Sequence, residues 1–284
     1  MACNAENLHF PGSTTTMRCF RGAQAGRPAI VFLHGLLGDG HQWDRLDIPC
    51  RPRDYADAYY IDYHFEQRRA CPLSFRELVG DTVRMLSAGP GLDHPHLALV
   101  GSSFGGHMAL YLDAFRLAHP QQLILFAPGG TREAASQRGL LKSHRNIDKI
   151  IDVSFERIFS DPSVARDPGI QEMIREYRRK IDPLRRDFAR NVISLSRAMK
   201  ESVLSLDDLA RVRAETLLVW GRNDIVTPPE ICNLMAQRLR DVRVAWTDSG
   251  HAAHVECAEE SSRLVREFCL STGRYARETA LTAV

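Results

Sequence analysis

The sequence contains no apolar run long enough to cross a bilayer. Its most apolar stretches, PAIVFLHGLLG and TLLVWG, are far shorter than the about 20 residues that a transmembrane helix needs. The first residues, MACNAENLHFPGSTTT, lack the basic start and the long apolar stretch of a secretory signal. We therefore expect a cytoplasmic protein with no membrane partner.

The chain also lacks a large excess of positive or negative charge, and it lacks closely paired cysteines. The formal net charge is +2 with 25% charged residues, so the chain has no basic field of the kind that binds nucleic acid. The 7 cysteines are odd in number and scattered, without a CxxC pair, which favours reduced thiols over a disulfide framework. No spacing typical of metal ligands occurs. We expect no nucleic-acid partner, no metal and no other cofactor.

The chain is long and apolar enough to build a large core. Its 284 residues are 44% hydrophobic, which suits one large domain or a core with an insertion. Short apolar runs alternate with stretches of helical spacing, and the runs lie at 29–34, 57–62, 96–101, 122–127, 216–221 and 242–247. Such runs are typical of parallel strands buried on both faces. The pattern predicts an α/β fold with a mostly parallel central sheet and helices on both faces, preceded by a hairpin around PGS.

The alternation of strands and helices stops after FAPGG and resumes at ETLLVWG. Residues 131–210 between them contain amphipathic helical pieces and no convincing strand. Asp-Pro pairs at 161–162, 167–168 and 182–183 mark expected helix boundaries, because proline disfavours helix at the residue before it. We expect a helical lid at 131–210, inserted into a core formed by 1–130 and 211–284.

The stretch LVGSSFGG places a serine at the centre of a Gly-x-Ser-x-Gly pattern. It follows an expected buried strand and begins a helix, the setting in which such a turn holds a nucleophile. The central residue of so tight a turn needs a strained, positive φ, and its neighbours two positions away must be small. Gly101 and Gly105 meet that need around Ser103, which we predict to be the nucleophile. Ser102 is expected to be a packing or hydrogen-bonding neighbour.

A serine nucleophile needs a base and a carboxylate that orients the base, in the chain order Ser, Asp or Glu, His. In LLVWGRNDIVTPPE, Asp224 stands just beyond a strand end, where a side chain reaches the carboxyl edge of the sheet. In WTDSGHAAHVECAEE, His251 follows the last strand directly, whereas His254 lies three residues further on and is expected within a helix. We predict that Asp224 and His251 complete the triad.

An oxyanion hole is expected from two backbone N–H groups. FLHGLLGDG runs from an early buried strand into a His-Gly turn, so the N–H of Leu36 faces the predicted site. The N–H of Phe104 begins the helix after the nucleophile and adds the positive end of the helix dipole. We predict that Leu36 and Phe104 hold the oxyanion.

The motifs HGLLG, GSSFGG, WGRND and SGHAAHVE together resemble the α/β-hydrolase superfamily with a helical lid. Within it, REYRRKIDP and the stretch up to TPPE are similar to the meta-cleavage-product hydrolases, which cleave carbon–carbon bonds. The resemblance implies that an arginine of the lid holds a substrate carboxylate, and alignment on Pro183 puts Arg175 at that place. Ser102, Phe104 and Ala252 depart from the residues usual in that family, so C–C cleavage is the minority expectation.

Helical spacing gives Arg175 a second, independent argument. It lies at the edge of the apolar stripe formed by Ile170, Met173, Ile174 and Tyr177, from which a long side chain can reach inward. A guanidinium there would suit a carboxylate or phosphate. The other basic residues around it are expected on a solvated helical face. We predict that Arg175 binds an anionic group of the substrate.

These features predict a serine hydrolase that forms an acyl-enzyme or related oxyanion intermediate. Its substrate would be a small ester, thioester or activated ketone, including one that carries a carboxylate. An acyltransferase with the same triad remains open, and so does a ligand-binding receptor of hydrolase fold. The complete triad and both glycines of the turn argue against the receptor.

Overall fold

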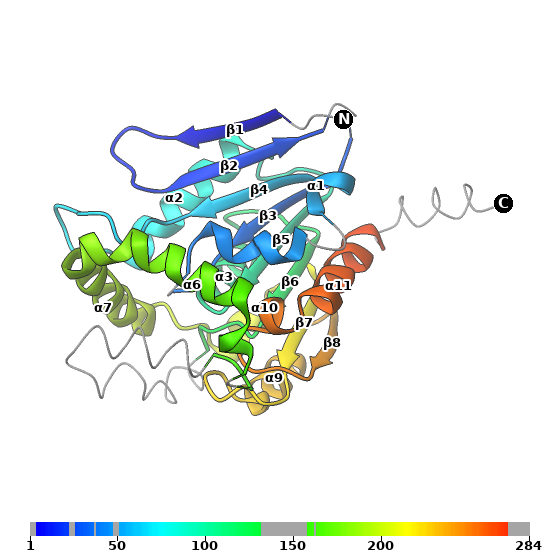
Figure 1. The fold of residues 1–284 in the computed structure, drawn as a ribbon. Coiled ribbons are helices and arrows are strands. Elements are labelled where there is room, and N and C mark those ends of the chain that lie inside the picture. Colours follow the sequence, from blue (N-terminus) through cyan, green and yellow to red (C-terminus); the bar gives the residue numbers. More distant parts are fainter. Residues whose placement is uncertain are drawn as a thin grey trace.

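The computed structural model describes residues 4–22, 26–36, 38–47, 51–131, 158–161 and 163–271. Its centre is an 8-stranded sheet in the order β1-β2-β4-β3-β5-β6-β7-β8. The strands are β1 (Asn4–His9), β2 (Thr16–Arg21), β3 (Ala29–Leu33), β4 (Asp57–Asp62), β5 (Leu97–Ser102), β6 (Gln122–Phe126), β7 (Glu215–Gly221) and β8 (Val242–Thr247). Strands β3 to β8 pair in parallel, while β2 is antiparallel to both β1 and β4. The predicted mostly parallel sheet is confirmed, and Figure 1 shows β1 and β8 at its two edges.

Helices cover both faces of this sheet, as the near-continuous apolar strands predict. They are η1 (Gly40–Asp47), α1 (Pro52–Tyr55), α2 (Phe75–Ala88), α3 (Phe104–Ala114), η2 (Val164–Arg166), α6 (Pro168–Ile181), η3 (Asp182–Leu184), α7 (Arg185–Glu201), α8 (Leu206–Leu209), α9 (Pro229–Ala236), α10 (Ala253–Glu256) and α11 (Ala258–Leu270). Alternate side chains of one strand enter two separate cores, since successive residues point to opposite faces. Val31 and Leu33 pack with α2 and α3, whereas Ile30 and Phe32 pack with η1 and α11.

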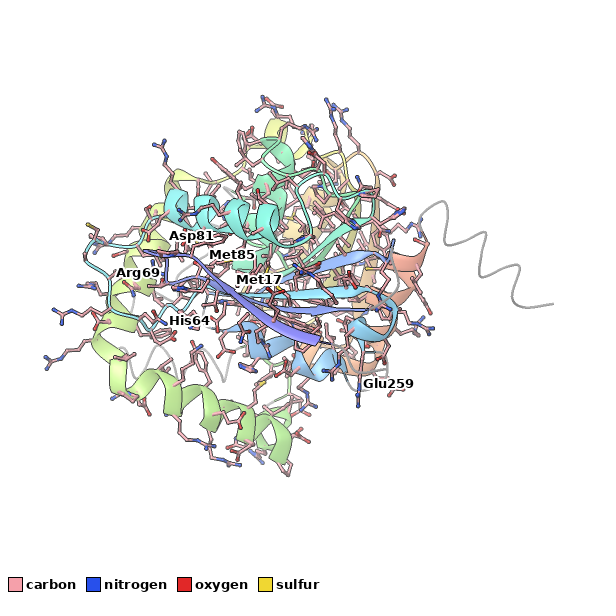
Figure 2. The ribbon with its side chains drawn as sticks, turned by 90° about the horizontal axis from the view of Figure 1, so that it is seen from above. Met17, His64, Arg69, Asp81, Met85 and Glu259 are labelled. Carbon is pink, nitrogen blue, oxygen red and sulfur yellow. The ribbon has the colours of Figure 1, made fainter. Side chains whose placement is uncertain are left out.

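The predicted hairpin is formed by β1 and β2 and is fastened to α2. Asp81 of α2 accepts hydrogen bonds from the hydroxyls of Ser13 at 2.7 Å and Thr15 at 2.9 Å, both in the turn. Met17 of β2 and Met85 of α2 share the core beneath them. Figure 2 labels Asp81, Met85 and Met17 where α2 lies beside the hairpin. The antiparallel edge is thus part of the same core as the parallel strands.

In its described part, the connection between β6 and β7 contains helices joined by turns and no strand, apart from the isolated bridge of Thr131 with Leu204. Asp167 caps α6 by accepting from the Ile170 N–H at 3.0 Å, and Asp182-Pro183 separates α6 from α7. These two predicted helix boundaries are confirmed. Pro162 of the boundary expected at 161–162, and all but the last two residues of the helical piece expected at 143–159, lie outside the described residues, which omit 132–157 and 162.

The loop after β4 holds this connection against the sheet. Asn191 of α7 donates to the carbonyls of Phe65 and Gln67, and Arg190 donates to that of Arg69, all in the loop after β4. Figure 2 shows His64 and Arg69 of this loop on the side where α6 and α7 lie. Helices α6 and α7 therefore cover the carboxyl end of β4.

Candidate active site

Ser103 occupies a strained turn between β5 and α3. Its φ is +50° and its ψ is −105°, so the predicted positive φ is confirmed. A side chain at Gly105 would bring a Cβ within 1.9 Å of the Leu33 carbonyl oxygen. One at Gly101 would come within 2.5 Å of the Gly105 backbone. Only glycine fits at either position, as the pattern predicts.

Backbone hydrogen bonds hold this turn in place. The Ser103 N–H donates to Phe126 O at 2.9 Å, and Ser103 O accepts from the N–H groups of His107 at 3.0 Å and Gly129 at 2.9 Å. A residue in such a conformation costs about 1–3 kcal/mol and persists only where its surroundings impose it. Ser102 is 4% exposed, whereas Ser103 is half-buried, and its Oγ makes no hydrogen bond to a described residue. The turn therefore presents one hydroxyl, that of Ser103.

Asp224 and His251 meet at the same edge of the sheet, beyond the ends of β7 and β8. His251 Nδ1 lies 2.8 Å from Asp224 Oδ2, and Asp224 is only 2% exposed. The other oxygen, Oδ1, accepts from the N–H groups of Val226 at 2.8 Å and Thr227 at 2.9 Å. Because a carboxylate only accepts, Nδ1 carries the proton in this pair and Nε2 is left to accept one.

Glycines let the loops of this pair approach each other. A Cβ at Gly221 would lie 2.0 Å from Gly250 O, so the end of β7 and the His251 loop touch backbone to backbone. Glu256 Oε1 accepts from the Gly250 N–H at 2.7 Å, and its Oε2 accepts from Ser160 N at 2.9 Å and Ser160 Oγ at 2.7 Å. The Ala252 N–H donates to Ile158 O at 3.1 Å. The His251 loop is thus tied to the β6–β7 connection.

His254, the competing histidine, lies in a different environment. Its ring stands 4.8 Å from that of Trp43, and its Nε2 is 3.2 Å from Nε2 of Gln42. Burial, helped by the charge on His251, lowers the pKa of His254 to about 3. His254 is therefore neutral, and it is His251 that the structure brings to Asp224.

The loop after β3 lies against the nucleophile turn. A Cβ at Gly35 would be 3.8 Å from Ser103 Cβ. Neither the Leu36 nor the Phe104 N–H donates to a group within the described residues, so both are available where the sequence places the oxyanion donors. Gln42 steadies this loop, because its Oε1 accepts from the Gly35 N–H at 3.1 Å while its amide reaches His254. This role of Gln42 was not predicted, because no sequence motif marks the residue.

A charged cluster beneath α6 was also missed. Lys180 Nζ lies 3.0 Å from Asp62, 3.2 Å from Asp39 and 3.5 Å from Glu66. Burial alone would lower the pKa of Lys180, but the three carboxylates outweigh it and raise the pKa. For Asp62, burial alone would raise the pKa, but His34, Lys180 and His64 outweigh it and lower the pKa.

His34 connects this cluster to the loop after β3. Its Nδ1 donates to Gly35 O at 2.7 Å, and its Nε2 accepts from the Tyr63 N–H at 3.1 Å. Burial lowers the pKa of His34, the direction that suits a ring whose Nε2 accepts from a backbone N–H. The cluster is therefore close to the loop that faces Ser103, because His34 adjoins Gly35 and Asp39 lies further along the same loop.

Arg175 does not point where the sequence predicts. Its side chain is 55% exposed and its Nη2 pairs with Glu172 at 2.7 Å on the outer face of α6. The inner face carries Ile170, Met173 and Ile174, which pack near His251 with Phe159, Ala252 and Val255. The basic residue of α6 that turns inward is Lys180, five positions later. The expectation that Arg175 enters the cleft is thus corrected.

Among the described residues, no helix is long and apolar enough to cross a membrane, and no group of histidine, cysteine and acidic residues could hold a metal.

Comparison with known proteins gives consistent results. A proline iminopeptidase of Pestalotiopsis fici is 27% identical over 256 residues, covering 81% of this chain and 87% of that protein. A 2-hydroxy-6-oxononadienedioate/2-hydroxy-6-oxononatrienedioate hydrolase of Paraburkholderia xenovorans is 26% identical over 271 residues, covering 88% of this chain and 89% of that protein.

Solved structures share the fold at low identity. A 2-hydroxy-6-oxo-6-phenylhexa-2,4-dienoate hydrolase from a Rhodococcus species superposes with a TM-score of 0.74 at 18% identity, covering 94% of this chain and 99% of that one. An enol-lactonase from Burkholderia xenovorans gives 0.72 at 18% identity, covering 89% and 96%. The sequence profile described as "Alpha/beta hydrolase family" matches residues 30–264. The chain is a hydrolase and belongs to the alpha/beta hydrolase family.

Proposed function

We propose that this hydrolase uses Ser103 as its nucleophile, His251 as its base and Asp224 as the carboxylate that orients the base. The observation that carries the proposal is the buried Asp224–His251 pair at the edge of the sheet where Ser103 stands in a strained turn. Neither feature serves stability. The positive φ costs free energy, and a buried carboxylate paired with a histidine is weak evidence for stability. Both are what nucleophilic catalysis requires.

The reaction begins when Ser103 Oγ attacks a carbonyl carbon and His251 Nε2 takes the hydroxyl proton. The Asp224 carboxylate then faces an imidazolium, which it stabilises through the Nδ1–H bond. Negative charge develops on the carbonyl oxygen, and the N–H groups of Leu36 and Phe104 hold it at the start of α3. His251 returns the proton to the leaving group. His251 then takes a proton from a water, which attacks the acyl-enzyme, and gives that proton to Ser103 Oγ as the acid leaves.

We propose a small ester, thioester or activated ketone as the substrate, with α6 and α7 acting as a lid. The apolar side chains of α6 pack beside the His251 loop, which supports this position for a lid. An anionic substrate is no longer favoured, because Arg175 is exposed and paired with Glu172. The curated relatives include C–C hydrolases, so a meta-cleavage dienone belongs in the substrate screen beside p-nitrophenyl esters and acyl-CoA thioesters.

Labelling with a fluorophosphonate tests the nucleophile directly. Wild-type protein should be labelled at Ser103, and Ser103→Ala should lose both the label and turnover, by roughly 10⁴-fold or more in kcat. Ser102→Ala is the matched control and should keep both. Labelling that survives in Ser103→Ala but disappears in Ser102→Ala would shift the nucleophile by one residue. An unlabelled wild-type protein would refute the proposal.

A further inference from the structure

A cavity of about 310 Å³ opens far from the candidate active site. It is lined by Ala114, Phe115, Arg116, Arg211, Arg213 and Arg240, which we call the arginine pocket. Arg213 and Arg240 precede the first residues of β7 and β8, whereas Asp224 and His251 follow the last ones. The arginine pocket and Ser103 therefore lie at opposite edges of the sheet.

The buried carboxylate of Asp113 positions two arginines of the arginine pocket. Asp113 is 1% exposed, and its Oδ1 accepts from Arg116 Nη1 at 2.9 Å. Its Oδ2 accepts from the N–H groups of Arg213 at 2.7 Å and Ala214 at 3.0 Å. One carboxylate thus fixes the Arg116 guanidinium and the backbone that carries Arg213. The order of these two arginines does not depend on a ligand.

Two further arginines each form one hydrogen bond or ion pair with a described residue. Arg240 Nε donates to Ala210 O at 2.7 Å, and Arg211 Nη1 pairs with Asp208 at 3.2 Å. The Arg211 guanidinium also lies 5.6 Å from the centre of the Phe115 ring. A guanidinium has five N–H donors, so most donors of both residues are unused. The Arg213 side chain forms no hydrogen bond or ion pair with any other residue that the structure describes.

Positive charge exceeds negative charge around this cavity. Asp113 and Asp208 carry the carboxylates that touch its arginines, and the C-terminal end of α3 adds about half a negative charge. Together they offset only part of four guanidinium charges. Like charges gathered in a concave surface repel one another, so the arrangement is more favourable with an anion between them.

We propose that the arginine pocket binds a small soluble ligand that carries phosphate groups. Guanidinium forks match phosphate oxygens in pairs, and arginines from three separate segments can grip one phosphate from several sides. Phe115, which is 37% exposed, and Ala114 offer an apolar wall to the rest of such a ligand. The site is independent of the chemistry proposed for Ser103.

Calorimetric titration of inorganic pyrophosphate into the full chain tests this site. At about 50 mM salt, where screening is weak, wild-type protein should bind one pyrophosphate saturably. The double variant Arg213→Gln/Arg240→Gln should bind it at least roughly tenfold more weakly, because two charge-assisted contacts are lost. Arg238→Gln is the matched control, because it removes an exposed charge nearby that does not line the pocket. It should bind like the wild type.

Both variants should keep the wild-type melting temperature and ester turnover, which separates lost binding from lost folding. Equal weakening in Arg238→Gln would reduce the effect to general electrostatic attraction and overturn the proposal. So would the absence of saturable binding by the wild type. Sedimentation with phosphatidic acid vesicles is the last arm. Binding to vesicles that depends on Arg213 and Arg240, without pyrophosphate binding, would mean a lipid headgroup and would overturn the soluble ligand.

Discussion

Replacing Lys180 by methionine should destabilise the protein measurably at neutral pH. The substitution keeps the length of the side chain but leaves Asp39, Asp62 and Glu66 without the cation they surround. Removing one partner of a buried ion pair costs about 3–5 kcal/mol. The Lys180 side chain is 28% exposed, so water screens part of this, and we expect about 2 kcal/mol. The corresponding fall in Tm is roughly 5 °C.

Urea denaturation at several pH values measures this loss and its cause. Burial alone would raise the pKa of Glu66, but the hydrogen bond to His64 and the charge of Lys180 outweigh it and lower the pKa. A carboxyl whose pKa is lowered by folding contributes stability above its unfolded pKa and loses it as the pH falls through its folded pKa. The wild type should therefore weaken below about pH 4, and its advantage over Lys180→Met should shrink there.

Two further variants decide whether the charge is responsible. Lys200→Met removes an exposed lysine from α7 and should change stability by less than about 0.5 kcal/mol. Adding Asp62→Asn to Lys180→Met removes one uncompensated charge and should restore part of the loss. A loss in Lys180→Met no greater than in Lys200→Met, or one that stays constant from neutral pH to pH 3, would refute the reasoning.

Three further predictions concern turnover, the first two measured with a p-nitrophenyl ester. Asp224→Asn should lower kcat by roughly 10³–10⁴-fold, since an amide no longer fixes the His251 tautomer, and unchanged turnover would remove the pair from the chemistry. Gln42→Leu takes away the acceptor of the Gly35 N–H and should lower kcat about tenfold with little change in KM, whereas a lower Tm alone would contradict a positioning role. Arg175→Ala should change kcat/KM less than about twofold for both a free acid and its methyl ester, because its ion pair is exposed. A loss of kcat/KM confined to the free acid would show that Arg175 contacts the substrate carboxylate and would contradict this prediction.

The parts of the fold that repeat along the chain were predictable. Apolar runs at 57–62 and 242–247 coincide with β4 and β8, and for β4, whose four central residues are buried, burial on a regular backbone explains the run. The turn at Ser103 was predictable for a related reason, since only glycine tolerates the approach of Leu33 and Gly105. A steric requirement between residues close in the sequence can therefore be predicted from the sequence.

Contacts between distant polar side chains were not predictable in the same way. On α6 the apolar stripe is clear, but neighbouring positions differ by 100° around the axis, and Arg175 falls on the outer side of its edge. Lys180 turns inward because it pairs with three carboxylates, those of Asp39 in the loop after β3, Asp62 at the end of β4 and Glu66 in the loop after β4. Gln42 likewise has its role from Gly35 and His254, and the second of these is 212 residues away. Contacts between polar side chains that are far apart in the sequence leave no periodic pattern from which they could be predicted.

The hydrogen bonds of Glu256 couple the loop of His251, the proposed base, to residues 158–160. Its carboxylate joins Gly250 to Ser160, and Ala252 adds a bond to Ile158. Each bond contributes about 1 kcal/mol or more, and those to a carboxylate contribute about 1.5–3 kcal/mol. Residues 158–160 therefore cannot shift alone. A displacement of residues 158–160 either breaks several of these bonds or carries the loop of His251 with it, so that any movement of this segment also acts on the proposed base.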